Sequence, residues 1–518
     1  MIKSPFRPAP RKKILIVNCY LDPSRTAVKR KLKIPQPMTP AYLAGIFSVE
    51  RCYIKLYDEV YSGPLEDEAL LSFPDMLVLT GLNVAFDRML HITAYVKTKN
   101  PKAIVVAGGP AIRALFKYSQ KFFDHCCQGD IEQLSEVVED EFGQEYVSRE
   151  YRERGWVMPR FDLAYWTKLL AYVESSRNCY FRCSYCSLTA EKGSYQPYSI
   201  EYVRRQIMQL GPRRLIHFSD NNFASNNKDF VAQRFALLKT LYDQGHILRW
   251  AGEVTCDFFL DGDNLKRAAE SGCGGLFCGV ESFDPGSLTH FNKHQNNCLP
   301  QVEMIQKCLR ANIPFHYGVV FDFSTRAIAE LADELDFIVN TPEIPLPSFI
   351  TLAIPLLKTP MFHACITDRR FLPNLRVRDL DGSTLCLKTI DPLPAAVQFL
   401  LKIKTLNGYR RRILKHIFDF YGIYRKVMAV ENIAMSQYGA LLLSAPQLFT
   451  LESDLRKVFF NRGHNGHRTH VGATECLDPV YKPAFRIESR YRPFFEPTRL
   501  TDANGDICEA LQPDLLAH

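Results

Sequence analysis

Apolar residues occur in short continuous runs, and these alternate with longer stretches in which apolar residues recur every three or four positions. Short continuous runs are typical of strands buried on both faces, and the longer pattern is typical of amphipathic helices. The first such series fills residues 13 to about 142 and predicts a doubly wound parallel sheet of flavodoxin or Rossmann type. Strands are expected at 13–18, 53–58, 75–80, 103–107 and 122–127, and helices at 39–50 and 84–99.

Glycines follow several of these expected strands, at Gly81, Gly108, Gly109 and Gly129. Doubly wound sheets bind ligands at the carboxyl ends of their strands, where glycine lets the backbone approach a flat or bulky ligand. The alternative is that these glycines only form tight turns from strand to helix. The sequence contains neither GxGxxG nor GxxxxGK[ST], so it predicts no dinucleotide or nucleoside triphosphate site.

A second alternating series follows a charged segment, residues 143–170, which we interpret as a linker. About six strand–helix units in residues 171–389 predict a full or partial β/α barrel, with its chemistry at the carboxyl ends of the strands. Strands are expected at 172–174, 214–218, 249–253, 275–280, 315–321 and 349–354, and helices at 199–210, 229–244, 263–271, 299–311 and 327–340.

Residues 390–518 have a different pattern and predict a mostly helical and irregular region. Helices are expected at 394–405 and 410–421. Residues 427–448 are apolar enough for a helix pair that is either buried or on a membrane surface, and we favour the buried arrangement. We therefore expect units at 1–142, 171–389 and 390–518, joined by the linker at 143–170.

Composition narrows the cellular context. Sixteen cysteines are scattered through 518 residues, which does not resemble a secreted disulfide framework. The apolar run at 14–17 is too short for the core of a signal peptide, and no run approaches the ~18 residues of a spanning helix. We expect a cytoplasmic protein without a transmembrane segment. The net charge of +8 is modest and predicts no nucleic-acid partner, although the run Arg410, Arg411 and Arg412 suits an anionic one.

Three of the cysteines, Cys179, Cys183 and Cys186, are spaced CxxxCxxC just after the first expected barrel strand. Three thiolates on one short loop can bind an iron–sulfur cluster, and a 4Fe–4S cluster has four ligand positions. One iron would be left open for a substrate or cofactor. This spacing predicts a metal centre at the barrel's edge.

Polar residues stand at the ends of the other barrel strands. Asp220 and Asn221, Glu253 and Glu281 each follow or end an apolar run, and Pro355 follows the last one. Any one of them alone would more often be a helix cap or a salt-bridge partner. Their repetition at one edge predicts a site.

Together these features resemble the radical S-adenosylmethionine (SAM) enzymes, and more narrowly the subclass with an N-terminal cobalamin-binding domain. The resemblance covers about residues 13 to 420 and includes Tyr185 before the last cysteine. It also rests on residues 75–81 and 103–110, and on the segments 218–223 (FSDNNF), 270–282 (ESGCGGLFCGVES), 292–296 (NKHQN) and 355–360 (PLLKTP).

The resemblance implies which residues hold each cofactor. The three cysteines would bind a 4Fe–4S cluster whose open iron chelates SAM, with Asp220 and Asn221 near the SAM amino group and Glu253 and Glu281 near its ribose. Tyr185, Ser282 and Pro355 would also contact SAM. The implied cobalamin-binding positions are Leu21, Gly81, Leu82, Asn83, Gly108, Gly109, Pro110 and Gly129.

One departure from the family pattern concerns cobalt. Many cobalamin domains carry DxHxxG, whose histidine binds cobalt from below, but here residues 18–24 read NCYLDPS and the first histidine is His91. The comparison therefore implies cobalamin without a histidine ligand, or a domain that has lost cobalamin.

The resemblance implies a methyltransferase that uses a 5′-deoxyadenosyl radical and methylcobalamin to methylate an unactivated carbon. The alternatives are a radical SAM cyclase or rearrangement enzyme of the same architecture and, from another class, a non-catalytic cobalamin or iron–sulfur sensor. We expect a small-molecule substrate, bulky or hydrophobic, and a reducing partner such as flavodoxin or ferredoxin.

Overall fold

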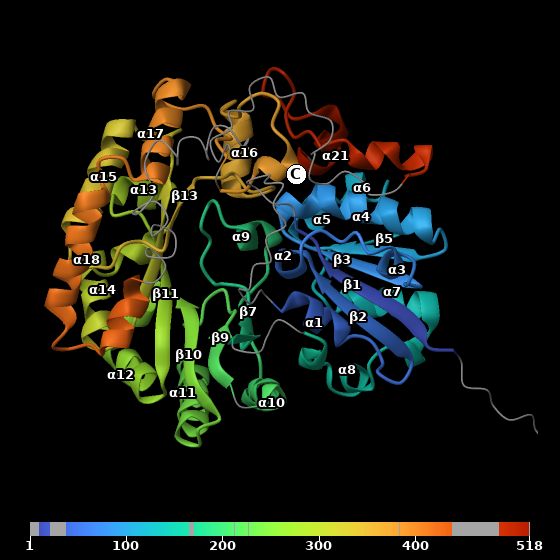
Figure 1. The fold of residues 1–518 in the computed structure, drawn as a ribbon, viewed down its shortest axis with the longest axis horizontal. Helices are drawn as coiled ribbons and strands as arrows, with labels where there is room; N and C mark the ends of the chain where they lie inside the picture. The colour runs from blue at the N-terminus through green and yellow to red at the C-terminus, as the bar shows by residue number, and fades with distance from the viewer. Residues whose placement is uncertain are drawn as a thin grey trace, which may run out of the picture.

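A computed structural model describes residues 10–20, 38–164, 170–211, 213–225, 227–382, 384–437 and 486–516. The predicted cobalamin contact Leu21 and the second half of the apolar stretch 427–448, residues 438–448, lie outside these ranges. Two parallel sheets stand side by side, with the C-terminal region across one end of both (Figure 1).

The first sheet is parallel throughout and has the order β2-β1-β3-β4-β5, a doubly wound arrangement. This confirms the predicted fold of the N-terminal region. Its central strands are buried on both faces, which explains their continuous apolar runs. The strands are β1 (Lys12–Asn18), β2 (Cys52–Asp58), β3 (Met76–Thr80), β4 (Ile104–Gly108) and β5 (His125–Cys127).

Helices cover both faces of this sheet. On β1, Leu15 and Val17 face one core and Ile14 and Ile16 face the other. The helices are α1 (Thr39–Ala44), α2 (Glu59–Ser62), α3 (Glu68–Leu71), α4 (Phe86–Lys99), α5 (Pro110–Ala114), α6 (Phe116–Ser119), α7 (Gln133–Phe142) and α8 (Arg149–Arg154).

Two local predictions need adjustment. The helix expected at 39–50 ends at Ala44, and the chain turns so that Phe47 forms an antiparallel bridge with Val147. Tyr146, Val147 and Val157, from the segment interpreted as a linker, are buried in the core beneath the first sheet. That segment therefore packs with the N-terminal unit.

The second sheet is also parallel, with the order β13-β12-β11-β10-β9-β6. It curls into a half-barrel whose edge strands β6 and β13 do not pair with each other in the described chain (Figure 1). The partial-barrel prediction is confirmed. Its strands are β6 (Leu170–Val173), β9 (Arg213–Phe218), β10 (Ile247–Val254), β11 (Cys273–Glu281), β12 (Phe315–Phe321) and β13 (Phe349–Leu352).

Helices surround the outside of the half-barrel, and a small antiparallel pair, β7 (Ser176–Arg177) and β8 (Gln196–Pro197), stands between the two sheets (Figure 1). The outer helices are α10 (Ile200–Leu210), α11 (Lys228–Asp243), α12 (Gly262–Glu270), α13 (Pro285–His290), α14 (Gln301–Arg310) and α15 (Ile328–Asn340).

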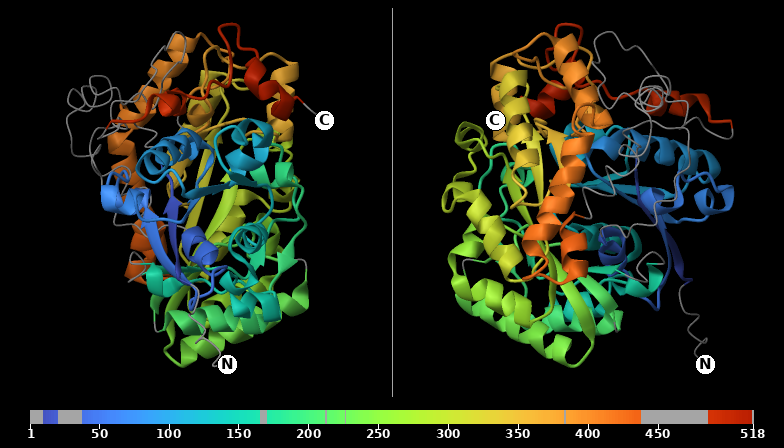
Figure 2. Two further views of the ribbon diagram at one scale, coloured as in Figure 1. Left: turned by 90° about the vertical axis from the view of Figure 1, so that its right-hand side faces the viewer. Right: turned by 60° about the vertical axis from the view of Figure 1, so that its left-hand side comes forward.

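The described part of residues 390–518 is helical and irregular, as predicted, and contains α17 (Leu393–Thr405), α18 (Arg410–Tyr424) and α21 (Gln512–Leu515). Another helix, α16 (Pro360–Thr367), follows the last strand of the half-barrel. We call residues 486–516 the strap, because they run over the first domain and the end of the barrel domain (Figure 2). None of the described helices combines the length and apolar character needed to cross a membrane.

Hydrogen bonds and ring contacts attach the strap to both units. Its Phe495 ring stacks on His91 of α4 with centroids 5.0 Å apart. Asp514 accepts hydrogen bonds from the backbone nitrogens of Lys117 and Tyr118 at 2.9 and 2.8 Å. On the other side, the Leu500 nitrogen donates to the Leu375 carbonyl at 2.7 Å.

Candidate active site

The CxxxCxxC loop begins after the β7 strand and ends where α9 (Ser187–Glu191) begins. Cys183 is buried, and Cys179 and Cys186 are half-buried. Burial raises the pKa of Cys179, and it raises the pKa of Cys186 to about 11, with neighbouring cysteines in the loop adding to both shifts. The mutual influence of these thiols shows that the loop gathers them into one locality.

Amide side chains approach two of the sulfurs. Asn222 Nδ2 lies 4.0 Å from Cys179 Sγ, and Gln295 Nε2 lies 3.4 Å from Cys183 Sγ. Hydrogen bonds to cluster sulfurs are one way in which a protein tunes an iron–sulfur centre.

This donor set fits a cluster better than a single ion. In the described residues, no three His, Cys, Asp or Glu side chains converge as they would around one metal ion. A 4Fe–4S cluster makes a different demand, because each thiolate binds a separate iron. Metal binding would also displace the protons that burial holds on Cys179 and Cys186.

A charged triad lies beside the loop. Glu281 Oε1 accepts hydrogen bonds from Tyr185 Oη at 2.9 Å and from Lys293 Nζ at 2.5 Å. Burial alone would lower the pKa of Lys293, but the Glu281 carboxylate raises it well above its usual value. Glu281 has φ 63°, a left-handed conformation that is costly for a non-glycine residue and typical of functional sites.

Asp220, at the end of β9, is fully buried and engaged by the chain itself. Its Oδ1 accepts from the Ser175 and Ser176 nitrogens at 2.6 and 3.0 Å. Its Oδ2 accepts from Ser175 Oγ and lies 3.4 Å from Arg234 Nη1. Burial raises the pKa of Asp220, and Arg234 and the serine donors oppose that rise. Asp220 thus anchors the segment that leads into the cysteine loop.

The other predicted SAM positions fall into two groups. Asn221 and Glu253 are exposed at the same edge of the half-barrel, where a ligand can reach them. Ser282 is buried and donates to Glu334 Oε1 at 2.7 Å, so α15 holds it, and Pro355 is buried. The structure brings these residues to one edge of the sheet, and their contacts with SAM stay predictions.

Polar side chains also line the inner face of the half-barrel. Tyr172 and His217 are paired across β6 and β9 with ring centroids 5.2 Å apart. Glu253, Phe277 and His316 are register partners on β10, β11 and β12. Desolvation by the surrounding strands raises the pKa of Glu253 to about 7, although this side chain stays accessible to solvent. Burial lowers the pKa values of His217 and His316 to about 4. At pH 7 both imidazoles are therefore neutral.

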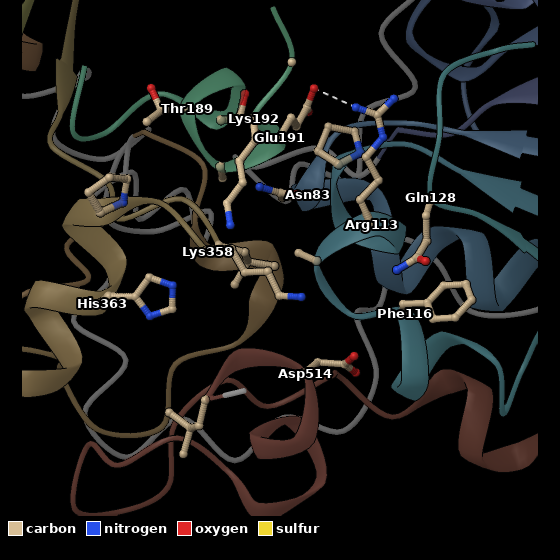
Figure 3. A pocket seen from close by; sticks show the side chains of 18 of the residues that line it. Asn83, Arg113, Phe116, Gln128, Thr189, Glu191, Lys192, Lys358, His363 and Asp514 are labelled. Atoms are coloured by element: carbon tan, nitrogen blue, oxygen red, sulfur yellow. Dashed lines mark ion pairs between the residues drawn. The ribbon is translucent and has the colours of Figure 1, made fainter. Parts of the chain in front are cut away.

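A large pocket separates the first sheet from the cysteine loop (Figure 3). Its volume is about 1100 Å³. The loops after β3, β4 and β5 form one wall, α9 and α16 form another, and the strap supplies Pro513, Asp514 and Leu516. Of the predicted cobalamin positions, three line it: Asn83, Pro110 and Gly129.

Asn83 shows that this wall is prepared for a polar ligand. Its side chain is nearly buried, projects into the pocket (Figure 3), and its Oδ1 has no hydrogen-bond partner among the described residues. A buried amide oxygen without a partner is costly unless a ligand or water satisfies it. Cobalamin, with peripheral amides around a large flat ring, fits a cavity of this size and polarity.

The glycines at the carboxyl edge of the first sheet differ in their surroundings. Gly109 has φ 113°, and a Cβ there would lie 2.7 Å from the Gly81 carbonyl oxygen. A Cβ at Gly81 would lie 2.9 Å from the Cys19 carbonyl oxygen. These two glycines let neighbouring loops touch, and their contacts with cobalamin stay predictions. Gly108 has ordinary space around its Cβ position, and Leu82 is exposed.

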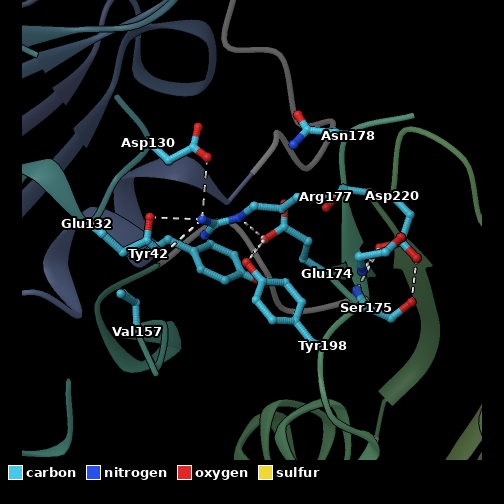
Figure 4. Close-up of polar contacts among 12 residues, drawn as sticks. Tyr42, Asp130, Glu132, Val157, Glu174, Ser175, Arg177, Asn178, Tyr198 and Asp220 are labelled. Carbon is cyan, nitrogen blue, oxygen red and sulfur yellow. Dashed lines mark hydrogen bonds and ion pairs between the residues drawn. The ribbon is translucent and has the colours of Figure 1, made fainter. Parts of the chain in front are cut away.

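Ion pairs join the two domains. Arg113 of α5 pairs with Glu191 of α9 at 2.6 Å. Arg177, two residues before Cys179, pairs with Glu132 of the first domain at 2.8 Å and with Glu174 at 3.1 Å (Figure 4). Burial raises the pKa of Glu174 to about 7, although Arg177 opposes the shift. These contacts couple the cysteine loop to the first sheet.

Sequence reasoning missed several residues of this site. Lys293 and Gln295 lie in the segment 292–296 that carried part of the resemblance, but no pattern assigned them a role. Asn222 follows the predicted Asn221, and here the buried amide, not the exposed one, approaches the cluster loop. The wall residues Arg113, Glu191, Lys358, His363 and Asp514 come from distant segments and give no local signal.

Comparisons with known proteins agree with this architecture. Residues 173–335 match the model of the Radical SAM superfamily. An uncharacterized methyltransferase of Synechocystis sp. is 26% identical over 227 residues, which are 42% of this chain and 41% of that protein. The match thus spans about two fifths of the relative's length.

Solved structures extend the likeness to most of the chain. The cobalamin-dependent SAM radical enzyme OxsB with aqua-cobalamin bound is 17% identical, with a TM-score of 0.57, and the match covers 88% of this chain and 83% of OxsB. OxsB with aqua-cobalamin and SAM bound is 15% identical, with a TM-score of 0.56 and coverage of 87% and 75%. At this identity the likeness concerns the fold. Residues 173–335 therefore match the Radical SAM superfamily, within a chain whose overall fold resembles that of OxsB.

Proposed function

We propose that this protein is a cobalamin-dependent radical SAM enzyme, and that it transfers a methyl group to an unactivated carbon of a small molecule. The observation that carries the proposal is the placement of the pocket, with the ligand-binding edge of a doubly wound sheet on one wall and the helix that follows the cysteine loop on the other. Two cofactors on these walls would face one substrate.

When bound, the cofactors would supply the difficult chemistry: a reduced cluster for the cleavage of SAM to a 5′-deoxyadenosyl radical, and methylcobalamin as the source of the methyl group. The chain holds them in place. Cys179, Cys183 and Cys186 bind the cluster, and Asn222 and Gln295 donate hydrogen bonds towards two of the sulfurs. Asn221 and Glu253, exposed at the same edge, are placed for the polar groups of SAM.

The triad beside the loop holds charge where SAM would bind. Lys293 pairs with the Glu281 carboxylate at 2.5 Å and balances its charge within a largely buried setting. Tyr185 donates to the same oxygen and thereby fixes the segment between Cys183 and Cys186. On the opposite wall, Asn83 offers its orphaned amide oxygen to a cobalamin amide.

Cluster assembly and SAM cleavage test the proposal first. We expect Cys183→Ala to abolish both the cluster's visible absorption and the 5′-deoxyadenosine formed after anaerobic reduction with SAM. Cys298→Ala is the matched control, because Cys298 is an exposed cysteine outside the loop, and it should leave both signals unchanged. Persistence of both signals in Cys183→Ala would overturn the assignment.

Cobalamin content and product mass test the rest. Protein produced with cobalamin present should retain about one equivalent after anaerobic gel filtration. Product should gain the mass of one CH₂ per turnover. Retained cobalamin without a mass gain would favour a cyclase or rearrangement enzyme, and absence of deoxyadenosine with bound cofactors would favour a sensor.

The reductant and the compartment follow from this chemistry. A low-potential electron carrier such as flavodoxin or ferredoxin would reduce the cluster, and a reducing cytoplasm would protect it and the remaining free thiols. Omitting the carrier in a reconstituted assay should stop deoxyadenosine formation.

A further inference from the structure

One apolar surface on the outside of the molecule takes no part in the site. Helix α18 packs its inner face on α15, with Ile413, His416, Phe420 and Tyr424 buried. His416 Nδ1 lies 3.1 Å from the Val339 carbonyl, and Tyr424 Oη donates to the Glu343 carbonyl at 2.6 Å. These contacts fix which face of α18 points outward, on the side of the molecule away from the first sheet (Figure 1).

The outward face carries large apolar side chains. Phe418 is 74% exposed, Leu414 38% and Tyr421 43%. Spacings of three and four residues place all three on one stripe of the helix. The exposed apolar surface continues past the end of the helix with Val427 and Val430. Contiguous exposed apolar groups of this kind mark interaction sites more often than scattered single ones do.

Basic side chains share this stripe. Arg411 and Lys415 alternate with the apolar residues on the same face, and Arg425 and Lys426 follow at its end, all of them exposed. Residues 410–431 contain six Lys or Arg and two Asp or Glu, and one of the two acids, Asp419, is paired with Lys415. The surface is therefore both apolar and positively charged.

We propose that the outer face of α18 and the turn after it, up to Val430, bind the surface of an anionic lipid bilayer. An interfacial helix places Phe and Leu at the headgroup boundary, while flanking Lys and Arg extend to the lipid phosphates. Each basic residue near such a surface adds attraction to anionic lipid. The inner face of α18 stays packed on α15, so binding needs no rearrangement of the fold. This inference is independent of the proposed function.

Vesicle co-sedimentation of the full chain tests it. We expect binding to phosphatidylcholine vesicles that contain about 30% phosphatidylglycerol, weaker binding when salt is raised to about 0.5 M, and little binding to phosphatidylcholine alone. The double variant Leu414→Ser, Phe418→Ser should lower the partition coefficient by about tenfold or more. Arg411→Gln with Arg425→Gln should remove the preference for anionic lipid.

Leu260→Ser is the matched control, since Leu260 is an exposed apolar residue elsewhere, and it should bind vesicles as the unmodified chain does. Circular dichroism checks that each variant is folded. Absence of binding to either vesicle, or binding that the serine variants do not change, overturns the proposal. So does a dimer in light scattering that Phe418→Ser converts to monomer, because the face would then belong to a second copy.

Discussion

Both sheets are parallel, but the polar groups at their carboxyl edges differ in how far the protein itself satisfies them. At the half-barrel, charged groups end the strands and the protein already satisfies them: Asp220 by two serines and Arg234, and Glu281 by Tyr185 and Lys293. At the doubly wound sheet, polar side chains and one glycine line a pocket of about 1100 Å³, and Asn83 Oδ1 has no partner among the described residues. A compact ligand suits the first edge, and a bulky ligand with polar groups suits the second.

Removing a buried charge at the carboxyl edge of the half-barrel should have the largest effect. Asp220→Ala leaves Arg234 buried without its partner and should lower the free energy of unfolding by about 3–5 kcal/mol. Urea denaturation measures this. The exposed pair Lys239–Asp243 supplies the control, and Asp243→Ala should cost no more than about 1 kcal/mol. Equal losses in the two variants would contradict the view that this edge is held by its own buried charges.

Titration of Glu174 should be the next largest effect. The folded protein keeps this carboxyl protonated up to about pH 7, whereas an unfolded chain releases the proton near its ordinary pKa. The native state therefore holds the extra proton, and the free energy of unfolding should fall as pH rises from about 4.5 to 7, by at most about 3 kcal/mol.

Comparing pH series of urea unfolding for the wild type and Glu174→Gln isolates this contribution. The variant should show a shallower fall over that range, while Glu68→Gln, an exposed acid, should keep the wild-type slope. A slope unchanged in Glu174→Gln would show that the Arg177 pair keeps the carboxyl ionised in the folded protein.

At the carboxyl edge of the doubly wound sheet, Asn83→Ala should weaken cobalamin retention with little effect on stability. Loss of one hydrogen bond to a buried amide corresponds to about a tenfold rise in Kd. Absorption of the cobalamin that remains after anaerobic gel filtration measures it. Asn100→Ala, which removes an amide that donates to the Pro74 carbonyl away from the pocket, should retain cobalamin normally.

The ion pair between Arg113 and Glu191, which joins the two domains, should give the smallest effect. Arg113 and Glu191 are both partly exposed, so a double-mutant cycle of Arg113→Gln and Glu191→Gln should give a coupling of about 1 kcal/mol or less. A much larger coupling would mean that the Arg113–Glu191 pair contributes as much as the buried charges at the half-barrel edge.

Much of this fold follows from local pattern. Buried parallel strands read as continuous apolar runs, so β1, β3, β4, β11 and β12 lie where the sequence predicts them. The cysteine spacing likewise predicts which thiols share one loop, because Cys179, Cys183 and Cys186 lie within eight consecutive residues. These features can be predicted from the sequence because the residues that form them are close along the chain.

What the sequence did not reveal depends on distant partners. Asp220 stands at a strand end as predicted, yet only the fold shows that Ser175 and Arg234 use its oxygens. Lys293 gives no sign that it neutralises Glu281. The pocket's third wall comes from residues 513–516, about 400 positions after Asn83. The helix expected at 39–50 is too long for a similar reason. Phe47 forms a bridge with the distant Val147, so α1 ends before it.

The strap has a consequence for the order of assembly. Residues 486–516 follow both sheets in the sequence, so a ribosome makes both sheets before it makes the strap, and domains generally fold as units during synthesis. The strap then binds α4 and α6 on one side and residues 375–377 on the other. The wall that it contributes is therefore the last to be placed. Until then the pocket lacks the side that Pro513, Asp514 and Leu516 form.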